Sequence, residues 1–176
     1  MGSVNLRWMA LLLISIALTG CGRMMEDLKP SNSDKHHSGQ IAPDFTLPDT
    51  NGASVSLLSV LSGTTVNGVV LYFTMWCPTC DVHMSSMRSS HIPIYPTIRF
   101  FAVDYVSGTV ADAGHSELSN GYAGSGFTVL ADTTQSVLNL YHATMGTTVV
   151  IDKTGMIRMN EDYKDDRLTA VLTGLP

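Results

Sequence analysis

The stretch Val69-Val70-Leu71-Tyr72-Phe73-Thr74-Met75-Trp76-Cys77-Pro78-Thr79-Cys80 decides the fold of this chain. Its first five residues are apolar, β-branched or aromatic, which is typical of a strand buried on both faces. A helical pattern follows, expected over about 79–90. A strand that ends in a turn here places Cys77 at a helix N-terminus, where unpaired backbone N–H groups stabilise a thiolate. We therefore expect Cys77 to be a nucleophile.

The two cysteines are spaced for reversible disulfide chemistry. Pro78 falls in the first turn of the expected helix, where its missing N–H costs nothing. The three-residue offset brings Cys80 beneath Cys77 on one helix face, close enough for a disulfide. We expect this redox-active pair to work without a cofactor, with zinc or copper binding at most adventitiously.

Outward from this stretch, strands alternate with helices and no internal repeat is visible. This alternation, closed by a hairpin at Asp152-Lys153-Thr154-Gly155, predicts one α/β domain with a central mixed β-sheet flanked by helices. Asp132 and Asp165 are expected helix N-caps. Further strands are expected at 99–103, 127–130, 147–151 and 156–159, and further helices at 109–121, 132–142 and 165–173.

Composition excludes several classes of protein. The 176 residues are 44 % hydrophobic and 14 % charged, which is enough apolar material for a core. Ten Lys and Arg against 15 Asp and Glu give a net charge of −5 without a basic cluster, so no nucleic-acid partner is expected. Three cysteines are too few for a disulfide-scaffolded mini-protein.

The N-terminus has the layout of a signal peptide. Arg7 precedes an apolar run over residues 8–18, which meets Leu18-Thr19-Gly20-Cys21. Eleven residues span only about 16 Å as a helix, far short of a hydrocarbon core of about 30 Å. Leu-Thr-Gly-Cys resembles the bacterial lipobox, which predicts a lipoprotein signal peptide at 1–20 and lipidation of Cys21; an ordinary signal peptide with an incidental Cys21 is the alternative. The polar segment 21–40 is expected to be a flexible tether.

The domain from 41 to 176 resembles the thioredoxin-like superfamily, specifically the membrane-tethered TlpA/ResA-like thiol:disulfide oxidoreductases, which are related to AhpC/TSA proteins. The resemblance rests on Ala42-Pro43-Asp44-Phe45, on Asn51-Gly52 at the family's opening hairpin, on Trp76-Cys77-Pro78-Thr79-Cys80 and on 150–155. It implies a thioredoxin-like fold with an N-terminal β-hairpin extension. In the family the first cysteine attacks a substrate disulfide and the second resolves the mixed disulfide, which maps onto Cys77 and Cys80.

The resemblance also implies where the protein works and on what. We expect a monomer, lipid-anchored to a membrane in the bacterial cell envelope and facing the periplasm or the exterior. Its partners would be the thiols or disulfides of exported proteins and a membrane redox partner that recharges the CxxC pair. Client-binding residues are expected at Trp76, Pro78, Gly146 and Thr147. The direction of electron flow is left open.

Three positions depart from the family pattern. His83 stands where the family often has a glutamate, and either carries protons for the cysteine pair or is a surface histidine. Leu71 stands at the thioredoxin position of a buried acid. Gly146 stands at the position of the family's cis-proline, and we expect a trans bond there because a non-proline cis bond costs about 2.5 to 4 kcal/mol.

Two other functions are compatible with the motif. Thr74 precedes Cys77 by three residues, as in thiol peroxidases, although Val70 fills their proline position. A copper or zinc carrier could use Cys77, Cys80 and His83. His115 or His142 would then supply a fourth ligand.

Overall fold

The computed structural model describes residues 38–176. The expected signal peptide, Cys21 and most of the expected tether lie outside the described residues, and the predictions made for them stay predictions. Within the expected tether, Gly39 and Gln40 are described and exchange backbone hydrogen bonds with Ile157. In residues 38–176, no helix combines the length and apolarity needed to cross a membrane.

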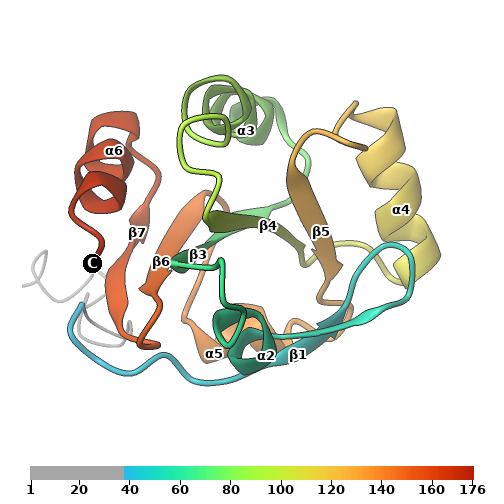
Figure 1. Ribbon diagram of the computed structural model, residues 1–176. Helices are drawn as coiled ribbons and strands as arrows, with labels where there is room; N and C mark the ends of the chain where they lie inside the picture. The colour runs from blue at the N-terminus through green and yellow to red at the C-terminus, as the bar shows by residue number, and fades with distance from the viewer. Residues whose placement is uncertain (1–37) are drawn as a thin grey trace, which may run out of the picture. The chain divides into compact units, whose positions relative to one another are not determined.

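A five-stranded mixed sheet forms the centre of the domain (Figure 1). The strand order is β5-β4-β3-β6-β7, with β3, β4 and β5 parallel and with β6 antiparallel to both β3 and β7. This confirms the expected α/β fold with a mixed sheet. The strands are β3 (Gly68–Thr74), β4 (Ile98–Asp104), β5 (Phe127–Ala131), β6 (Thr147–Asp152) and β7 (Ile157–Asp162).

A separate two-stranded hairpin precedes the sheet. It consists of β1 (Thr46–Pro48) and β2 (Ser54–Ser56), paired antiparallel. The Asp49 carboxylate accepts hydrogen bonds from the N–H groups of Asn51 and Ala53, and Gly52 adopts the positive φ of +82° that the turn requires. The predicted N-terminal hairpin is therefore present, in a sheet of its own.

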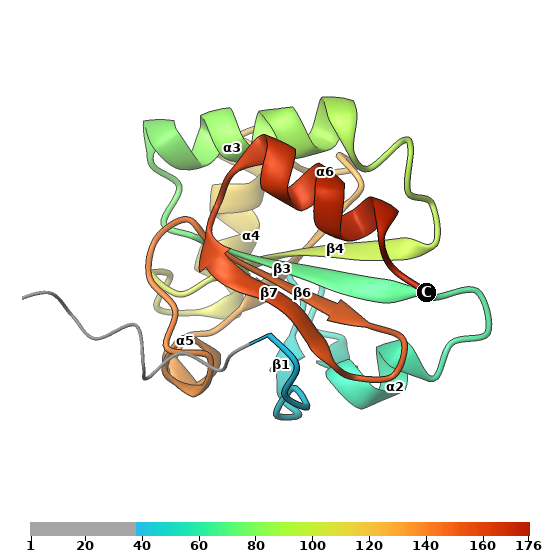
Figure 2. The same cartoon turned by 90° about the vertical axis from the view of Figure 1, so that its left-hand side faces the viewer.

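Helices cover both faces of the central sheet (Figures 1 and 2). Helices α3 and α6 lie on one face, and α2 and α5 lie on the other together with β1. Helix α2 was not expected from the sequence, and α5 is shorter than predicted. The bounds are α2 (Leu57–Leu61), α3 (Pro78–Ser90), α4 (Val110–Ser119), α5 (Ser136–Leu140) and α6 (Asp165–Thr173).

The two expected aspartate caps do not occupy N-cap positions. Asp165 is the first residue of α6, and Lys164 precedes it as the N-cap without a side-chain hydrogen bond. Asp132 lies four residues before α5, yet its carboxylate accepts hydrogen bonds from the N–H groups of Val137 and Leu138. Asp132 thus caps the first turn from a distance because the intervening residues form a turn.

The core is divided into two layers by the sheet. Side chains alternate along β3, so that Val70 and Tyr72 pack in the layer beneath α3 and α6, whereas Leu71 and Phe73 pack in the opposite layer. All residues of β3 are buried. The strand that carries the cysteine motif is therefore anchored in both layers, and its end at Thr74 is a rigid base for the site.

Candidate active site

The cysteine motif lies at the junction of β3 and α3. Cys77 is the N-cap of α3 with extended backbone angles, and its sulfur accepts a hydrogen bond from the Cys80 N–H at 3.2 Å. Pro78 is the first helical residue, where its fixed φ suits the helix. The placement predicted from the sequence is the one observed. A helix N-terminus directed at the Cys77 sulfur favours negative charge there.

The two sulfur atoms lie 2.8 Å apart, and both cysteines are free. Cys77 is half-buried, whereas Cys80 is only 1 % exposed. Burial opposes ionisation of Cys80, but hydrogen bonds from Cys77, from backbone groups and from Thr74 outweigh it, so that the pKa of Cys80 is lowered. Of the two sulfurs, that of Cys77 is the more accessible to a partner molecule.

Trp76 has an unusual backbone conformation immediately before the cysteines. Its φ is +59°, in the left-handed region that a bulky residue rarely adopts. Two contacts hold it there: its N–H donates to Thr74 Oγ1 at 3.1 Å, and its indole Nε1–H donates to Asp104 Oδ2 at 2.8 Å. Trp76 is therefore fixed beside Cys77 by residues of β3 and β4.

Asp104 was not singled out in the sequence. It is fully buried at the end of β4, and besides Trp76 it accepts hydrogen bonds from the Ser107 hydroxyl and from the N–H groups of Val106 and Ser107. The signal that could have found it is its place after a buried strand parallel to β3. The carboxyl ends of parallel strands meet at one edge of a sheet, where ligands bind and active sites form.

His83 directly precedes the buried Met84, and its ring packs against Tyr72 of the sheet and against Tyr163. Its Nδ1 is 2.9 Å from the hydroxyl of Tyr72 on β3. Its ring stacks on Tyr163 with centroids 4.5 Å apart. Burial lowers the pKa of His83, which favours the neutral imidazole at pH 7. His83 is thus half-buried, with its ring in contact with two tyrosines.

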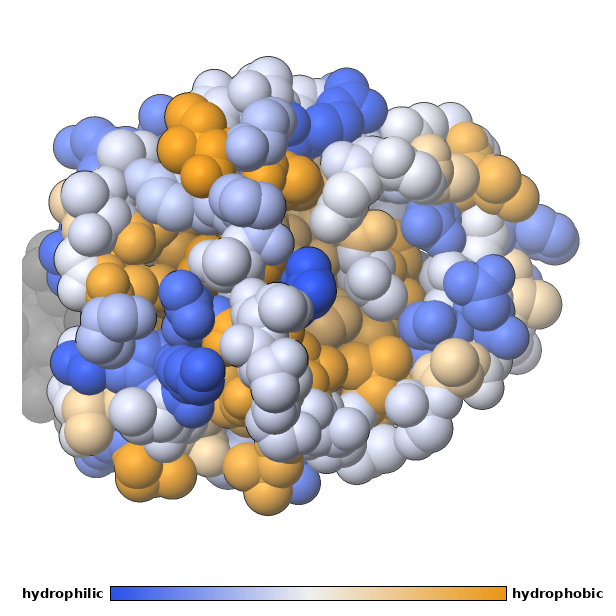
Figure 3. Space-filling view, in the orientation of Figure 1, coloured by the Kyte–Doolittle hydropathy of each residue, from blue (hydrophilic) through white to orange (hydrophobic). Residues whose placement is uncertain are grey.

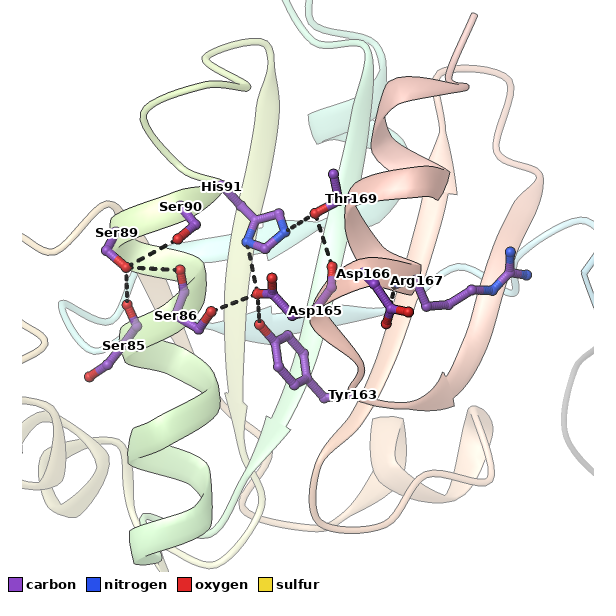
Figure 4. A network of polar contacts seen from close by, with 10 residues as sticks. All are labelled: Ser85, Ser86, Ser89, Ser90, His91, Tyr163, Asp165, Asp166, Arg167 and Thr169. Carbon is purple, nitrogen blue, oxygen red and sulfur yellow. Dashed lines mark hydrogen bonds and ion pairs between the residues drawn. The ribbon is translucent and has the colours of Figure 1, made fainter.

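Figure 4 shows the polar network that holds Tyr163 in place between α3 and α6. The Tyr163 hydroxyl donates to Asp165 Oδ1 at 2.7 Å, and the Ser86 hydroxyl donates to the same oxygen at 2.6 Å. These two hydrogen bonds lower the pKa of Asp165. The buried His91 completes the cluster, with its Nδ1 3.9 Å from Asp165 Oδ1 and its Nε2 3.0 Å from Thr169 Oγ1.

The Gly146 loop lies beside His83. Gly146 is buried with a φ of +83°, its N–H donates to Phe73 O, and the peptide bonds of the described residues are all trans, as expected at this position. A Cβ added at Gly146 would lie 3.7 Å from the His83 ring. Thr147 is fully buried, and its hydroxyl accepts from the Thr144 N–H, so its side chain is not available to a client.

The ligand set of the metal-carrier alternative is not assembled in this structure. Among residues 38–176, no three His, Cys, Asp or Glu side chains gather so that they could hold a metal ion. The expected set of Cys77, Cys80 and His83 therefore does not form a metal site here. The His83 Nδ1 instead lies 2.9 Å from the Tyr72 hydroxyl. His115 lies on α4, away from α3 in the fold.

Many solved structures have a similar fold, and three of them illustrate the likeness. Mycobacterium tuberculosis (MTB) dsbF is 25 % identical, with a TM-score of 0.62 over 77 % of this chain and 99 % of that one. A Chlorobium tepidum protein assigned as thiol:disulfide interchange protein DsbE is 24 % identical, with a TM-score of 0.62 over 77 % and 98 %. The peroxidoxin BcpB of Mycobacterium tuberculosis is 20 % identical, with a TM-score of 0.62 over 79 % and 97 %.

The fold, the cysteine pair at the start of α3 and these neighbours define the chain as a thioredoxin-like oxidoreductase. The sequence pattern of the AhpC/TSA family matches residues 38–160. The chain therefore belongs to the AhpC/TSA family. A search of curated proteins found no match.

Proposed function

We propose that this chain is an exported, lipid-anchored oxidoreductase that exchanges a dithiol and a disulfide with exported protein clients through Cys77 and Cys80. The observation that carries the proposal is the unequal burial of the two neighbouring sulfurs. Cys77 is reachable at the helix N-terminus, and Cys80 is buried 2.8 Å behind it. An accessible nucleophile with a shielded resolving thiol is the arrangement that two-step disulfide exchange requires.

The exchange proceeds in two steps. The Cys77 thiolate attacks one sulfur of a client disulfide, so that a Cys77–client bond forms and the other client sulfur leaves as a thiolate. The Cys80 thiolate then attacks the Cys77 sulfur, which forms the Cys77–Cys80 disulfide and releases the second client thiolate. Two electrons pass to the client, two protons pass to its sulfurs, and the reverse sequence oxidises a client. His83 serves as proton carrier for this pair.

Exposed apolar side chains beside the motif support a protein client. Met75, two residues before Cys77, is 44 % exposed, and Met145, next to the Gly146 loop, is 37 % exposed. Methionine adapts to irregular apolar surfaces because its side chain is unbranched and flexible. On the face drawn in Figure 3, apolar side chains (orange) reach the surface in several places among polar ones.

The order of attack is tested by trapping. Cys80→Ser leaves Cys77 able to attack and the mixed disulfide unable to resolve, so covalent client complexes should accumulate, and Cys77→Ser should trap almost none. A variant with both Cys77→Ser and Cys80→Ser is the control, since it has no thiol in the CxxC pair and should trap no client. Equal trapping by Cys80→Ser and Cys77→Ser would contradict the assigned order.

The direction of exchange is tested by equilibration of the Cys77/Cys80 couple with glutathione buffers. A reduction potential near about −270 mV indicates a reductant and one near about −120 mV an oxidant. A reductant must be recharged by a membrane electron donor, because the compartment outside the cytoplasm does not supply reduced thiols, whereas an oxidant must be recharged by an electron acceptor.

The membrane anchor is tested at Cys21. If a lipid on this residue holds the chain, Cys21→Ser should release it from membranes or stall its processing, because the apolar run is too short to span a bilayer. Unchanged membrane retention and unchanged electrophoretic mobility of the variant would contradict lipidation.

A thiol peroxidase is the second candidate, favoured by the similarity in fold to a peroxidoxin. It predicts peroxide consumption at a rate that depends on Cys77 and is matched by oxidation of the Cys77/Cys80 pair. Peroxide consumption without client trapping by Cys80→Ser would favour this candidate over the first. Stoichiometric metal in protein purified without oxygen, lost in either cysteine variant, would favour a carrier.

A further inference from the structure

Tyr72 lies between the resolving cysteine and His83. Its side chain is fully buried in the layer under α3, and its hydroxyl is 2.9 Å from His83 Nδ1. Tyr72 and Cys80 are buried in the same core cluster, and burial together with the charge of the nearby Cys80 raises the pKa of the Tyr72 hydroxyl. One O–H group thus lies in the same buried cluster as a sulfur that must lose a proton and within hydrogen-bond distance of a nitrogen that can accept one.

Cys80 needs help to ionise at one stage of the exchange. In the free dithiol, a hydrogen bond from Cys77 is the largest contribution that favours the Cys80 thiolate. Once Cys77 is bonded to a client sulfur it has no thiol proton to donate, and that contribution is lost. The burial of Cys80, which opposes ionisation, persists. At this stage the neighbouring Tyr72 hydroxyl is in place to take up the thiol proton.

His83 is suited to receive this proton. Burial lowers its pKa, so the imidazole is neutral near pH 7 and its Nδ1 can accept from the Tyr72 hydroxyl. Tyr72 faces His83 from β3, and Tyr163 stacks on it from the segment between β7 and α6. Asp165 on α6 fixes Tyr163 through its hydroxyl (Figure 4). The histidine ring is therefore held in one orientation toward Tyr72.

We propose that Tyr72 relays the proton of Cys80 to His83 when Cys80 resolves the mixed disulfide, an inference that rests on the proposed function. The Cys80 S–H proton passes to the Tyr72 oxygen as the Tyr72 O–H proton passes to His83 Nδ1. Tyr72 ends neutral, His83 becomes an imidazolium, and the Cys80 thiolate attacks Cys77. The imidazolium then gives its proton to solvent or to the departing client thiolate, so that protons balance.

The relay is tested by stopped-flow reaction of the reduced full-length chain with dithiobis(nitrobenzoate), a disulfide that releases a coloured thiolate. The first phase reports attack by Cys77, and the second reports release by Cys80 of the group bound to Cys77. Because this leaving thiolate needs no proton, the second phase isolates the deprotonation of Cys80. Tyr72→Phe should leave the first phase unchanged and slow the second by about ten-fold or more.

The pH dependence gives a readout that a structural role would not move. In the wild type the second phase should slow as the pH falls through the His83 pKa, which burial places below the usual value, because a protonated His83 cannot accept from Tyr72. Tyr72→Phe should lose this inflection. Tyr141→Phe is the matched control: it removes the hydroxyl of an equally buried tyrosine, bonded to Pro43 O in the opposite core layer, and should keep both phases.

His83→Gln provides a second variant that leaves the buried tyrosine intact. It should slow the second phase as Tyr72→Phe does, and the double variant should be no slower than either, because both break one relay. A wild-type second phase in folded Tyr72→Phe, or losses that multiply in the double variant, would overturn the relay alone. A wild type that lacks the first phase would overturn the proposed function and the relay together.

Discussion

Replacement of Asp104 by Asn should loosen the tryptophan that precedes the cysteine pair. The Asp104 carboxylate accepts hydrogen bonds on both oxygens: Oδ2 from Trp76 Nε1 at 2.8 Å and from Ser107 Oγ at 2.6 Å, and Oδ1 from two backbone N–H groups at 3.0 Å. An asparagine can keep its oxygen toward the backbone groups. Its NH₂ group then faces Trp76 Nε1–H, and two donors cannot bond to one another.

The expected cost follows from these contacts. The Ser107 hydroxyl can rotate and accept from the new NH₂ group, but the indole N–H of Trp76 has no such freedom. A buried donor left unpaired costs about 1–3 kcal/mol, and the remaining hydrogen bonds lose the strength that the negative charge gave them. We therefore expect Asp104→Asn to lower the free energy of unfolding by about 2–3 kcal/mol.

Tryptophan fluorescence measures both the stability and the position of the ring. The chain has two tryptophans, so in a Trp8→Phe background Trp76 is the only one. Urea unfolding followed by this fluorescence gives the free energy of unfolding. Without the Asp104 bond the ring should be more exposed in the folded variant, with emission shifted to longer wavelength than in the wild type.

Asp112→Asn is the control, because Asp112 is an exposed carboxylate in the first turn of α4. It should cost less than about 1 kcal/mol. If Asp104→Asn cost no more than this control and left the Trp76 emission unchanged, the carboxylate would not be what holds Trp76 in its positive-φ conformation.

Two further predictions concern the turn at Asp152, which pairs with the start of β3, and the Gly146 loop beside His83. Asp152→Asn should cost about 2–3 kcal/mol, because the buried Asp152 carboxylate binds Arg158 and backbone N–H groups of its own turn. Burial opposes ionisation of Asp152, but its hydrogen bonds outweigh burial and lower its pKa. The stabilisation that the carboxylate provides is therefore complete above about pH 4 and is lost as the pH falls through the folded-state pKa. Urea unfolding should show the stabilities of wild type and variant converging at low pH, and a difference that stays constant with pH would contradict this prediction. Gly146→Pro should cost about 3 kcal/mol or more, since its φ of +83° excludes proline and the bond from its N–H to Phe73 O is lost. Gly146→Ala should cost only about 1–2 kcal/mol by the same measurement, and equal losses would refute this account of the loop.

Local patterns determined much of the fold and the position of the cysteine pair. The apolar run of β3, the proline after Cys77 and the Asn51-Gly52 turn each act within a few residues, through strand burial, helix initiation and turn geometry. The structure places each of these as expected. Helix α2 escaped prediction because five residues carry too little periodicity.

The surroundings of the cysteines were decided by tertiary structure. The indole of Trp76 meets Asp104 across 28 positions of the chain, and Ser86 meets Asp165 across 79. Periodicity places Tyr72 on a buried face of its strand. It does not show which group the Tyr72 hydroxyl contacts. Hydrogen bonds between side chains depend on the orientation of packed elements to within a fraction of an ångström, and one sequence does not encode that orientation locally. The sequence by itself therefore determined the place of the cysteine pair and of its helix, and the packing of α3 against β3 and of α6 against α3 decided which side chains surround the pair.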